Sequence, residues 1–379
     1  MAVMFDLAHH LFFVPWTDPQ SGVTSFILNE RVAPVQQSFY FTNASVSPDE
    51  RWLWFYCAAP PNPQSTLGVV SLDPSRPMIR HFPAAGFTSA SPMVSPAGEE
   101  PGCYLAVGPS VWFQPLDGEA RVVCTLGDDF VAGRTLFRLA THLTLSADGR
   151  LFLLDGQVGN SYFIALGDRR SGQVRVVKEL ANNHNHGQFS PIHPELFTVA
   201  HDHTHDPITG RRLHFDNRIW LLDIHDSRYE GLTPHRYCKP HHAIAHEWWS
   251  RDGWVCYVDY DSGAYELDLA TRKLQHVWPT PLCHVHCDHL TPRRWWCADE
   301  SPYKWDQKPC EVRFFDRTTG RQAQIVSAMP PPPLPRKSYH LDPHPQFSPR
   351  DSWIVYTTTV RGRVDVALCP VEALKLRTA

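Results

Sequence analysis

A short unit recurs seven times along this 379-residue chain and restricts the folds open to it. Each copy has a polar residue, a short alternating segment, a Ser-Pro-Asp-Gly turn or a relative of it, and then an apolar strand. Two examples are "HLTLSADGRLFLLD" from His142 and "HEWWSRDGWVCYVDY" from His246. The turn position is occupied in the seven copies by Ser47, Ser95, Ser146, Ser190, Ser250, Thr291 and Ser348.

The spacing of this unit predicts the fold class. Asp-Gly and Pro-Asp between two β-rich runs are hairpin signals because these residues tolerate tight turns. Successive turn residues are 41 to 60 residues apart, which is room for about four strands. Seven such units predict an all-β chain folded as a seven-bladed β-propeller, in one domain over residues 1–379.

The two ends of the repeat and its one proline-rich segment fit this prediction. The strand "VTSFILNE" from Val23 precedes the first copy, so we expect it to complete the last blade and close the ring. The segment "SAMPPPPLPRKS", residues 327–338, lies between copies six and seven. We therefore interpret it as a loop over one face and not as a linker between domains.

Composition limits the partners. A net charge of −4 and a pI near 6.6 give no electrostatic footprint for nucleic acid or for an anionic membrane. No apolar run is long enough to cross a bilayer. The start has no basic region ahead of its apolar segment, and ten cysteines are scattered without a regular framework. These features favour a cytoplasmic protein with reduced thiols, and they leave its oligomeric state open.

Histidines recur at one register position of the repeat. Four of the seven copies carry histidine four residues before the turn, and in the sixth copy His286 stands beside that position. A single histidine near a strand start is usually a satisfied polar residue, but convergence around one axis favours a histidine-lined channel mouth. The residues at this position are Asn43, Ser91, His142, His186, His246, Cys287 and His344.

Further polar clusters accompany these histidines. "AHDHTHD" contains His201, with two later histidines that are better interpreted as a solvated loop. "CHVHCDH" contains His286, and "SYHLDPHPQ" supplies Tyr339, His340, Asp342 and His344. Imidazole, carboxylate and thiolate are common ligands of divalent ions. Since neighbouring blades bring His286 and His344 together, we predict a metal site there. Alternate residues of a strand point to opposite faces, so only part of the cysteine-histidine cluster can bind one ion.

At these residues the chain resembles the oligogalacturonate lyase family, the seven-bladed propeller polysaccharide lyases. "HEWWSRDG" matches the family's His-Glu-Phe-Trp stretch before a Pro-Asp-Gly turn, and "NRIWLLD" matches its Ala-Arg-Met-Trp-Leu strand. "NHGQFSP" and "VAHDHTHD" correspond to a Gly-His-Pro and a Cys-His-Glu segment, and "LDPHPQFSP" echoes His-Pro-His-Pro-Ser-Phe-Thr-Pro. The similarity runs from about residue 36 to the C-terminus and is strongest after residue 184.

The resemblance implies β-elimination of an acidic, uronate-containing oligosaccharide, with a manganese-type ion holding the substrate carboxylate. The family's proposed base falls on His246, its strand arginine on Arg218, and two of its metal histidines on His286 and His344. The chain departs from the family's Gln-x-x-His-x-His pattern, because "YHLDPH" puts Tyr339 at the glutamine and Asp342 at the first histidine. His340 is then an additional candidate ligand. Manganese is the expected ion, and zinc and calcium stay open.

The predicted roles follow from the elimination chemistry. We assign His246 as the base and Arg218, together with the metal, as the groups that stabilise the carboxylate and the developing enolate. His186 and His201 are assigned to the second proton transfer or to the substrate. The remaining candidates for substrate binding are His142, Asn43, Tyr40 and Tyr339.

Three alternatives stay open. The opening "QQSFYFTNASVSPDERWLWF" from Gln36 also resembles propeller lyases that act on ulvan or on rhamnose-glucuronate linkages. A non-catalytic ligand-binding propeller would show the same repeat. A metal-dependent hydrolase ranks last, because strand alternation predicts that the carboxylate of Glu247, next to His246, points away from the channel.

Overall fold

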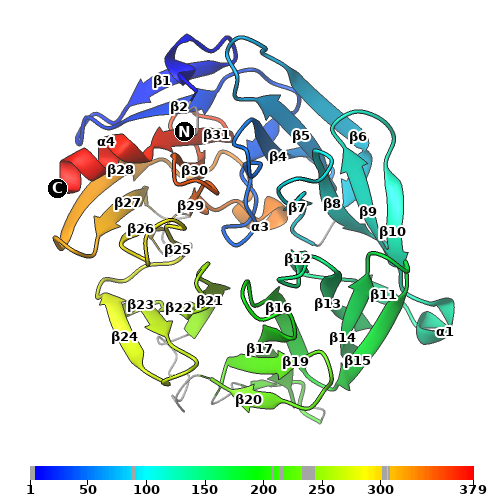
Figure 1. Ribbon diagram of the computed structural model, residues 1–379. Helices are drawn as coiled ribbons and strands as arrows, with labels where there is room; N and C mark the ends of the chain where they lie inside the picture. The colour runs from blue at the N-terminus through cyan, green and yellow to red at the C-terminus, as the bar shows by residue number, and fades with distance from the viewer. Residues whose placement is uncertain are drawn as a thin grey trace.

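A computed structural model describes residues 5–87, 90–206, 208–213, 217–232, 244–300, 305 and 308–379. It contains seven antiparallel sheets arranged in a ring about a central axis (Figure 1). This confirms the predicted all-β, seven-bladed propeller. No helix among the described residues has the length and apolar character that a membrane crossing needs.

The first three blades follow the chain order. Blade one comprises β3 (Val35–Gln37), β4 (Trp52–Ala58), β5 (Ser65–Ser71) and β6 (Ile79–Phe87). Blade two comprises β7 (Met93–Val94), β8 (Gly102–Val107), β9 (Ser110–Pro115) and β10 (Arg121–Thr125). Blade three comprises β11 (Leu136–Arg138), β12 (Thr144–Leu145), β13 (Leu151–Val158), β14 (Ser161–Asp168) and β15 (Val174–Leu180).

The next three blades repeat this plan. Blade four comprises β16 (Asn183–Phe189), β17 (Leu196–His205), β18 (Arg212–Leu213), β19 (Ile219–Asp223) and β20 (Tyr229–Gly231). Blade five comprises β21 (Ile244–Trp249), β22 (Val255–Asp259), β23 (Gly263–Leu267) and β24 (Leu274–Trp278). Blade six comprises β25 (Val285–Cys287), β26 (Trp295–Asp299), β27 (Cys310–Asp316) and β28 (Arg321–Met329).

Blade seven joins the two ends of the chain. It comprises β29 (Gln346–Phe347), β30 (Trp353–Thr358), β31 (Asp365–Pro370), β2 (Thr24–Leu28) and β1 (Phe13–Thr17). In Figure 1 the blue N-terminal strands lie beside the red β31. Ile27 pairs with Ala367, and the Tyr356 hydroxyl donates to Ser25 Oγ at 2.8 Å. The N-terminal segment therefore contributes the fourth and fifth strands of the last blade.

The helices among the described residues are short. They are the 3-10 turn η1 (Leu7–His9) and the helices α1 (Asp128–Val131), α3 (Arg336–Tyr339) and α4 (Val371–Thr378), of which α3 lies near the centre of the ring (Figure 1). Within the proline-rich segment, residues 330–335 are the loop that joins β28 to α3, whereas residues 327–329 end β28 and residues 336–338 belong to α3.

The recurring turn has one hydrogen-bond pattern. In blade five, Ser250 Oγ donates to Asp252 Oδ1 at 2.7 Å and accepts the Trp254 N–H at 3.0 Å, and Gly253 takes the positive φ of 88°. Ser47 and Ser146 make the same bonds to the aspartate two residues later, each at 2.5 Å. In blades one, three and five the Ser-x-Asp signature is therefore a side-chain-supported turn that leads into the second strand of the blade.

Two inner strands carry bulges that place histidines at the axis. The register of β16 shifts between Asn185 and Gln188, and that of β21 shifts between Ala245 and Trp248. His186 and His246 lie inside these bulges with φ of 53° and 50°. Such backbone is uncommon for residues other than glycine, and a bulge re-aims the side chain that it carries.

Candidate functional site

Tyr40 lies in the middle of a cluster of histidines from five blades. Its ring stacks on His142 at 4.5 Å between centroids with an interplanar angle of 15°. Its hydroxyl is buried and has no hydrogen-bond partner among the described residues. The other imidazoles within 6.3 Å of its ring centroid are His186, His246, His284, His340 and His344. The predicted convergence of histidines is present, with a phenol at its centre.

Asn43 holds the segment that carries Tyr40. Its Nδ2 donates to the Leu143 carbonyl at 2.9 Å, so it ties this segment to blade three. Its Oδ1 accepts from the Thr42 hydroxyl at 3.3 Å. Both ends of the amide thus have partners within the protein, and the structure places Asn43 as a support of Tyr40 rather than as the predicted substrate contact.

His284, Asp342 and His344 form a group that can hold a metal ion. All three are buried, and their ligand atoms lie within 4.8 Å of one another. His284 Nδ1 donates to Asp299 Oδ2 at 2.9 Å, and the His344 N–H donates to the same carboxylate oxygen at 3.2 Å. His344 Nε2 is buried without a hydrogen-bond partner among the described residues. Two nitrogens and one oxygen, oriented by a second carboxylate, suit a divalent ion.

His286 and His340, two predicted ligands, lie outside the metal-binding groups found among the described residues. Blade six lacks the bulge of blades four and five, since His286 pairs with Cys297 in unbroken register. Its Nδ1 accepts the Phe347 N–H at 3.2 Å. His340 is exposed, and its ring stacks on Tyr40 at 5.7 Å. The prediction of His286 as a ligand is therefore corrected to His284, and His340 covers the cluster.

A hydrogen bond to the backbone fixes the tautomer of His246. Its Nδ1 donates to the Cys283 carbonyl at 2.8 Å, so the neutral ring keeps its lone pair on Nε2. The Tyr260 hydroxyl lies 3.4 Å from Nε2. Burial, followed by the neighbouring His284, lowers the pKa of His246 well below 6.5. The imidazole is thus neutral at physiological pH.

Arg218, just before β19, is partly buried and lies between two carboxylates. Its Nη1 donates to Asp202 Oδ1 at 2.8 Å and its Nε to Glu247 Oε2 at 3.2 Å. Burial alone would lower the pKa of Arg218, but the two carboxylates outweigh it and the pKa is raised. Glu247 also lies 3.4 Å from His186 Nδ1. The prediction that Glu247 points away is therefore wrong, because the bulge in β21 breaks the alternation on which it rested.

His142 and His186 form the wall on the side of blades three and four. Their ring centroids are 5.0 Å apart, and both ring nitrogens of His142 are buried without a partner among the described residues. Burial is the main cause that lowers the pKa of His142 well below 6.5, and burial followed by Arg218 lowers that of His186 to about 3. Unpaired buried nitrogens are costly unless a ligand satisfies them.

The two remaining candidates lie at the margin of the cluster. His201, on β17, stacks on His184 at 4.4 Å, and its N–H donates to the Arg218 carbonyl at 2.7 Å. Tyr339 lines a cavity of about 90 Å³ together with Tyr40, His340 and His344. The Tyr339 carbonyl accepts from Gln37 Nε2 at 3.1 Å. Tyr339 thus borders the space over Tyr40, and His201 lies behind Arg218.

The structure adds residues that sequence reasoning left out. Asp299 orients His284, and Cys283 accepts from His246. Arg138 donates to the carbonyls of Asp155 and His184, and its charge lowers the pKa values of His142 and His186. His284 and Cys283 belong to the "CHVHCDH" cluster, which the sequence already marks. They, and not His286, lie at the site because blade six has no bulge.

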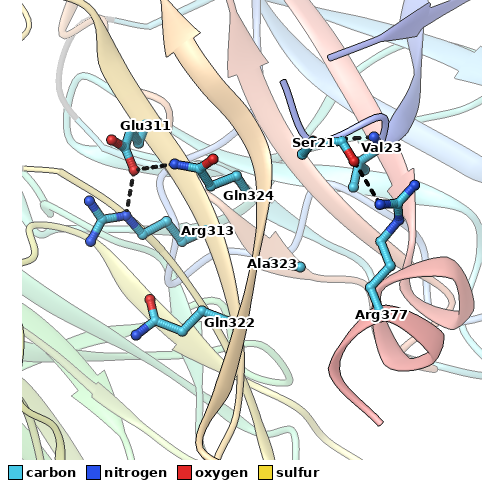
Figure 2. A pocket seen from close by; sticks show the side chains of 8 residues that line it. All are labelled: Ser21, Val23, Glu311, Arg313, Gln322, Ala323, Gln324 and Arg377. Carbon is cyan, nitrogen blue, oxygen red and sulfur yellow. Dashed lines mark hydrogen bonds and ion pairs between the residues drawn. The ribbon is translucent and has the colours of Figure 1, made fainter. Parts of the chain in front are cut away.

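A larger cavity than the one over Tyr40 lies elsewhere. It has a volume of about 600 Å³ and is lined by residues of β27, β28, α4 and the N-terminal segment (Figure 2). Figure 2 shows Arg313 bonded to Glu311 and Arg377 bonded to Ser21, at 2.7 and 2.6 Å. None of the residues around Tyr40 lines it. Its arginines are already paired, so we place the functional site at the histidine cluster.

Comparison with solved structures supports the fold assignment. No family model matches it, and no curated protein matches it. An oligogalacturonate lyase in complex with manganese aligns with a TM-score of 0.72 and 18% identity, over 95% of this chain and 96% of that one. The oligogalacturonate lyase of Vibrio parahaemolyticus aligns with a TM-score of 0.74 and 15% identity, over 95% and 97%. A puromycin hydrolase aligns with a TM-score of 0.54 over 87% of this chain and 53% of its own.

The fold of this protein is therefore that of the oligogalacturonate lyases over nearly its whole length. At 15–18% identity this similarity describes the fold, and the chemistry depends on the residues of the site.

Proposed function

We propose that this protein is a polysaccharide lyase that cleaves uronate-containing glycans by β-elimination, with oligogalacturonate as its expected substrate. The observation that carries the proposal is the convergence of a neutral histidine, a partly buried arginine and a metal-binding group around Tyr40. Arg218 is close enough to lower the pKa of His246 and to oppose the rise in the pKa of Tyr40. These groups therefore act on one substrate position.

The base of the elimination is His246. Its Nε2 lone pair takes the proton from C5 of the uronate, the C5–H electrons form the C4=C5 double bond, and the C4–O bond breaks. A neutral imidazole is required for this step, and burial keeps His246 neutral. The product is a 4,5-unsaturated uronate at the new end of the chain.

Arg218 stabilises the charge that develops on the substrate carboxylate. Its guanidinium is fixed by Asp202 and Glu247, so it needs no reorganisation when the enolate forms. The leaving oxygen needs a proton, and the Tyr40 hydroxyl, which has no partner among the described residues, is a donor inside the histidine cluster. His142 and His186 offer polar contacts to the sugar hydroxyls.

His284, Asp342 and His344 would hold a divalent ion, for which manganese is our first expectation. When bound, such an ion would supply Lewis-acid stabilisation of the uronate carboxylate. Asp299 orients His284 for this role. The nitrogen-rich donor set favours manganese or zinc over calcium, which prefers an all-oxygen shell.

The contacts of Glu247 disfavour the alternative that the protein is a metal-dependent hydrolase. A hydrolase would need a carboxylate that activates water, and Glu247 is committed to Arg218 and His186. A lyase on ulvan or rhamnose-glucuronate linkages would use the same base, the same charge stabilisation and the same proton donor. The experiment below therefore compares these uronates directly.

The test is ultraviolet absorbance during incubation of the purified protein with oligogalacturonates, ulvan fragments and rhamnose-glucuronate oligosaccharides, each with and without chelator. We expect rising absorbance from the unsaturated uronate on at least one substrate, and its loss with chelator. Absence of any rise from a folded, metal-loaded sample would contradict lyase activity on these uronates and favour a binding propeller.

A further inference from the structure

We infer that Cys283, together with His246 and His284, forms a second metal site, selective for thiophilic ions and mutually exclusive with the His284–Asp342–His344 site. The first observation is the distance from the Cys283 sulfur to the two imidazole nitrogens. Cys283 Sγ lies 3.6 Å from His246 Nδ1 and 3.8 Å from His284 Nε2. A tetrahedral zinc ion with ordinary Zn–S and Zn–N bonds separates its sulfur and nitrogen ligands by about 3.6 Å. Both nitrogens thus already lie at the distance from the sulfur that one ion needs.

Burial and rigidity support the same assignment. Cys283 and His284 are 0% and 1% exposed, and the rings of His246 and His284 are 4.1 Å apart. The three residues satisfy the mutual limit of 4.8 Å for a metal-binding group. The bulge in β21 fixes the backbone of His246, and Asp299 fixes the ring of His284. Little conformational entropy would be lost when an ion binds.

The two sites exclude one another because they share His284. Its Nδ1 is bonded to Asp299, which leaves Nε2 as its single ligand atom. An ion on Asp342 and His344 therefore competes with an ion on Cys283 and His246. Thiolate ligands select softer ions such as zinc and cobalt, whereas a carboxylate and imidazoles suit manganese. The identity of the ion decides which set is occupied.

This exclusion has a functional consequence, which rests on the proposed function. An ion in the thiolate set takes a nitrogen of His246 and breaks the Nδ1–H bond to the Cys283 carbonyl. The base would then be held by the metal. Zinc should therefore inhibit a lyase that manganese supports.

The experiment uses Co²⁺ without substrate, so its outcome does not depend on lyase activity. Metal-free protein is titrated with Co²⁺ while the thiolate-to-cobalt charge-transfer band is recorded, and Zn²⁺ is then added. We expect a band at one equivalent that Zn²⁺ removes. The band should persist in Asp342→Asn and in Cys287→Ser, a matched buried thiol four residues away. It should be lost in Cys283→Ser and weakened in His246→Asn.

Bound Co²⁺ without a thiolate band would place the ion in the nitrogen-oxygen set and overturn the inference. A band that survives unchanged in Cys283→Ser would overturn it as well. Circular dichroism checks that each variant is folded, and His246→Asn tests the site independently if Cys283→Ser does not fold. In a separate sample, Zn²⁺ should release bound Mn²⁺, seen as the resonance of the free ion, and retention of Mn²⁺ would contradict the shared ligand.

Discussion

At the residue scale, one backbone conformation decides the role of His246. Its φ of 50° turns the imidazole to the axis, and the bond from Nδ1 to the Cys283 carbonyl sets the tautomer. We predict that His246→Asn lowers turnover roughly 10²- to 10⁴-fold, the range for general acid–base catalysis. Asparagine removes the base but tolerates the positive φ, so the thermal midpoint should change little. Retained turnover would show that another group takes the proton, and His9→Asn, at an exposed histidine, is the control.

The Tyr40 hydroxyl gives a second residue-scale prediction. It is buried without a described partner, so Tyr40→Phe removes a group that folding does not satisfy. We expect the free energy of unfolding to stay level or rise by about 1 kcal/mol, while turnover falls roughly 10²-fold. Urea unfolding and steady-state kinetics measure the two effects. Tyr356→Phe, which loses the bond to Ser25, should instead lose stability and keep its activity.

A loss of stability without loss of turnover in Tyr40→Phe would assign the phenol a packing role. That outcome would move the second proton transfer to His142 or His186, whose rings adjoin Tyr40.

At the element scale, the end of β26 supports the metal group of the neighbouring segment. Asp299 is the last residue of this strand and binds both His284 Nδ1 and the His344 N–H. We predict that Asp299→Asn weakens Mn²⁺ binding about 10- to 100-fold, as loss of a carboxylate behind a ligand histidine usually does. Mn²⁺ titration by electron paramagnetic resonance measures this. Asp316→Asn, a buried carboxylate at the end of β27, should bind Mn²⁺ normally, and equal affinities would contradict the role of Asp299.

Strand bulges also mark the limit of what the sequence predicts. The Ser-x-Asp-Gly signature predicts the turn between the first two strands of blade five, because that turn is made by local side-chain bonds. The position of His246 four residues before that turn can also be predicted from the sequence. The bulges cannot be predicted from it, because they depend on pairing with the next strand. For that reason strict alternation misplaced Glu247, and a common register for all blades selected His286 instead of His284.

At the scale of the whole molecule, ring closure depends on the N-terminal strands. Ile27 is fully buried in a cluster with Tyr356 and Ala367. We predict that Ile27→Ala lowers the free energy of unfolding by about 2–5 kcal/mol, the usual cost of removing a buried aliphatic side chain. Denaturant unfolding measures this change. A loss below about 0.5 kcal/mol, typical of a surface position, would mean that closure contributes little to stability.

The histidines that surround Tyr40 make stability depend on pH. Folding lowers the pKa of His142 well below 6.5 and that of His186 to about 3. Below pH 6.5 the unfolded chain binds protons that the native protein does not, so stability present above 6.5 is lost as pH falls toward the native pKa values. Each histidine contributes at most about 1.4 kcal/mol per pH unit. Urea midpoints between pH 7.5 and about 5 measure this, and His186→Asn should flatten the slope.

The site as a whole is predicted only in outline by the sequence. Histidines converge on the axis as the repeat indicates, since His142, His186, His246 and His344 occupy one register position. Arg138 and Asp299 carry no motif. They join the site through contacts between segments far apart in the chain, which only the folded ring brings together.

The most direct test of the central claim is the fate of solvent oxygen during turnover. Metal-loaded protein is incubated with the active uronate oligosaccharide in water enriched in the heavy oxygen isotope, and the products are weighed by mass spectrometry. β-Elimination predicts two products whose masses, apart from oxygen exchange at the reducing ends, sum to that of the substrate, and an unsaturated uronate end that carries no heavy oxygen. A product that has gained labelled water would mean hydrolysis and would contradict the assignment of His246 as the base of an elimination.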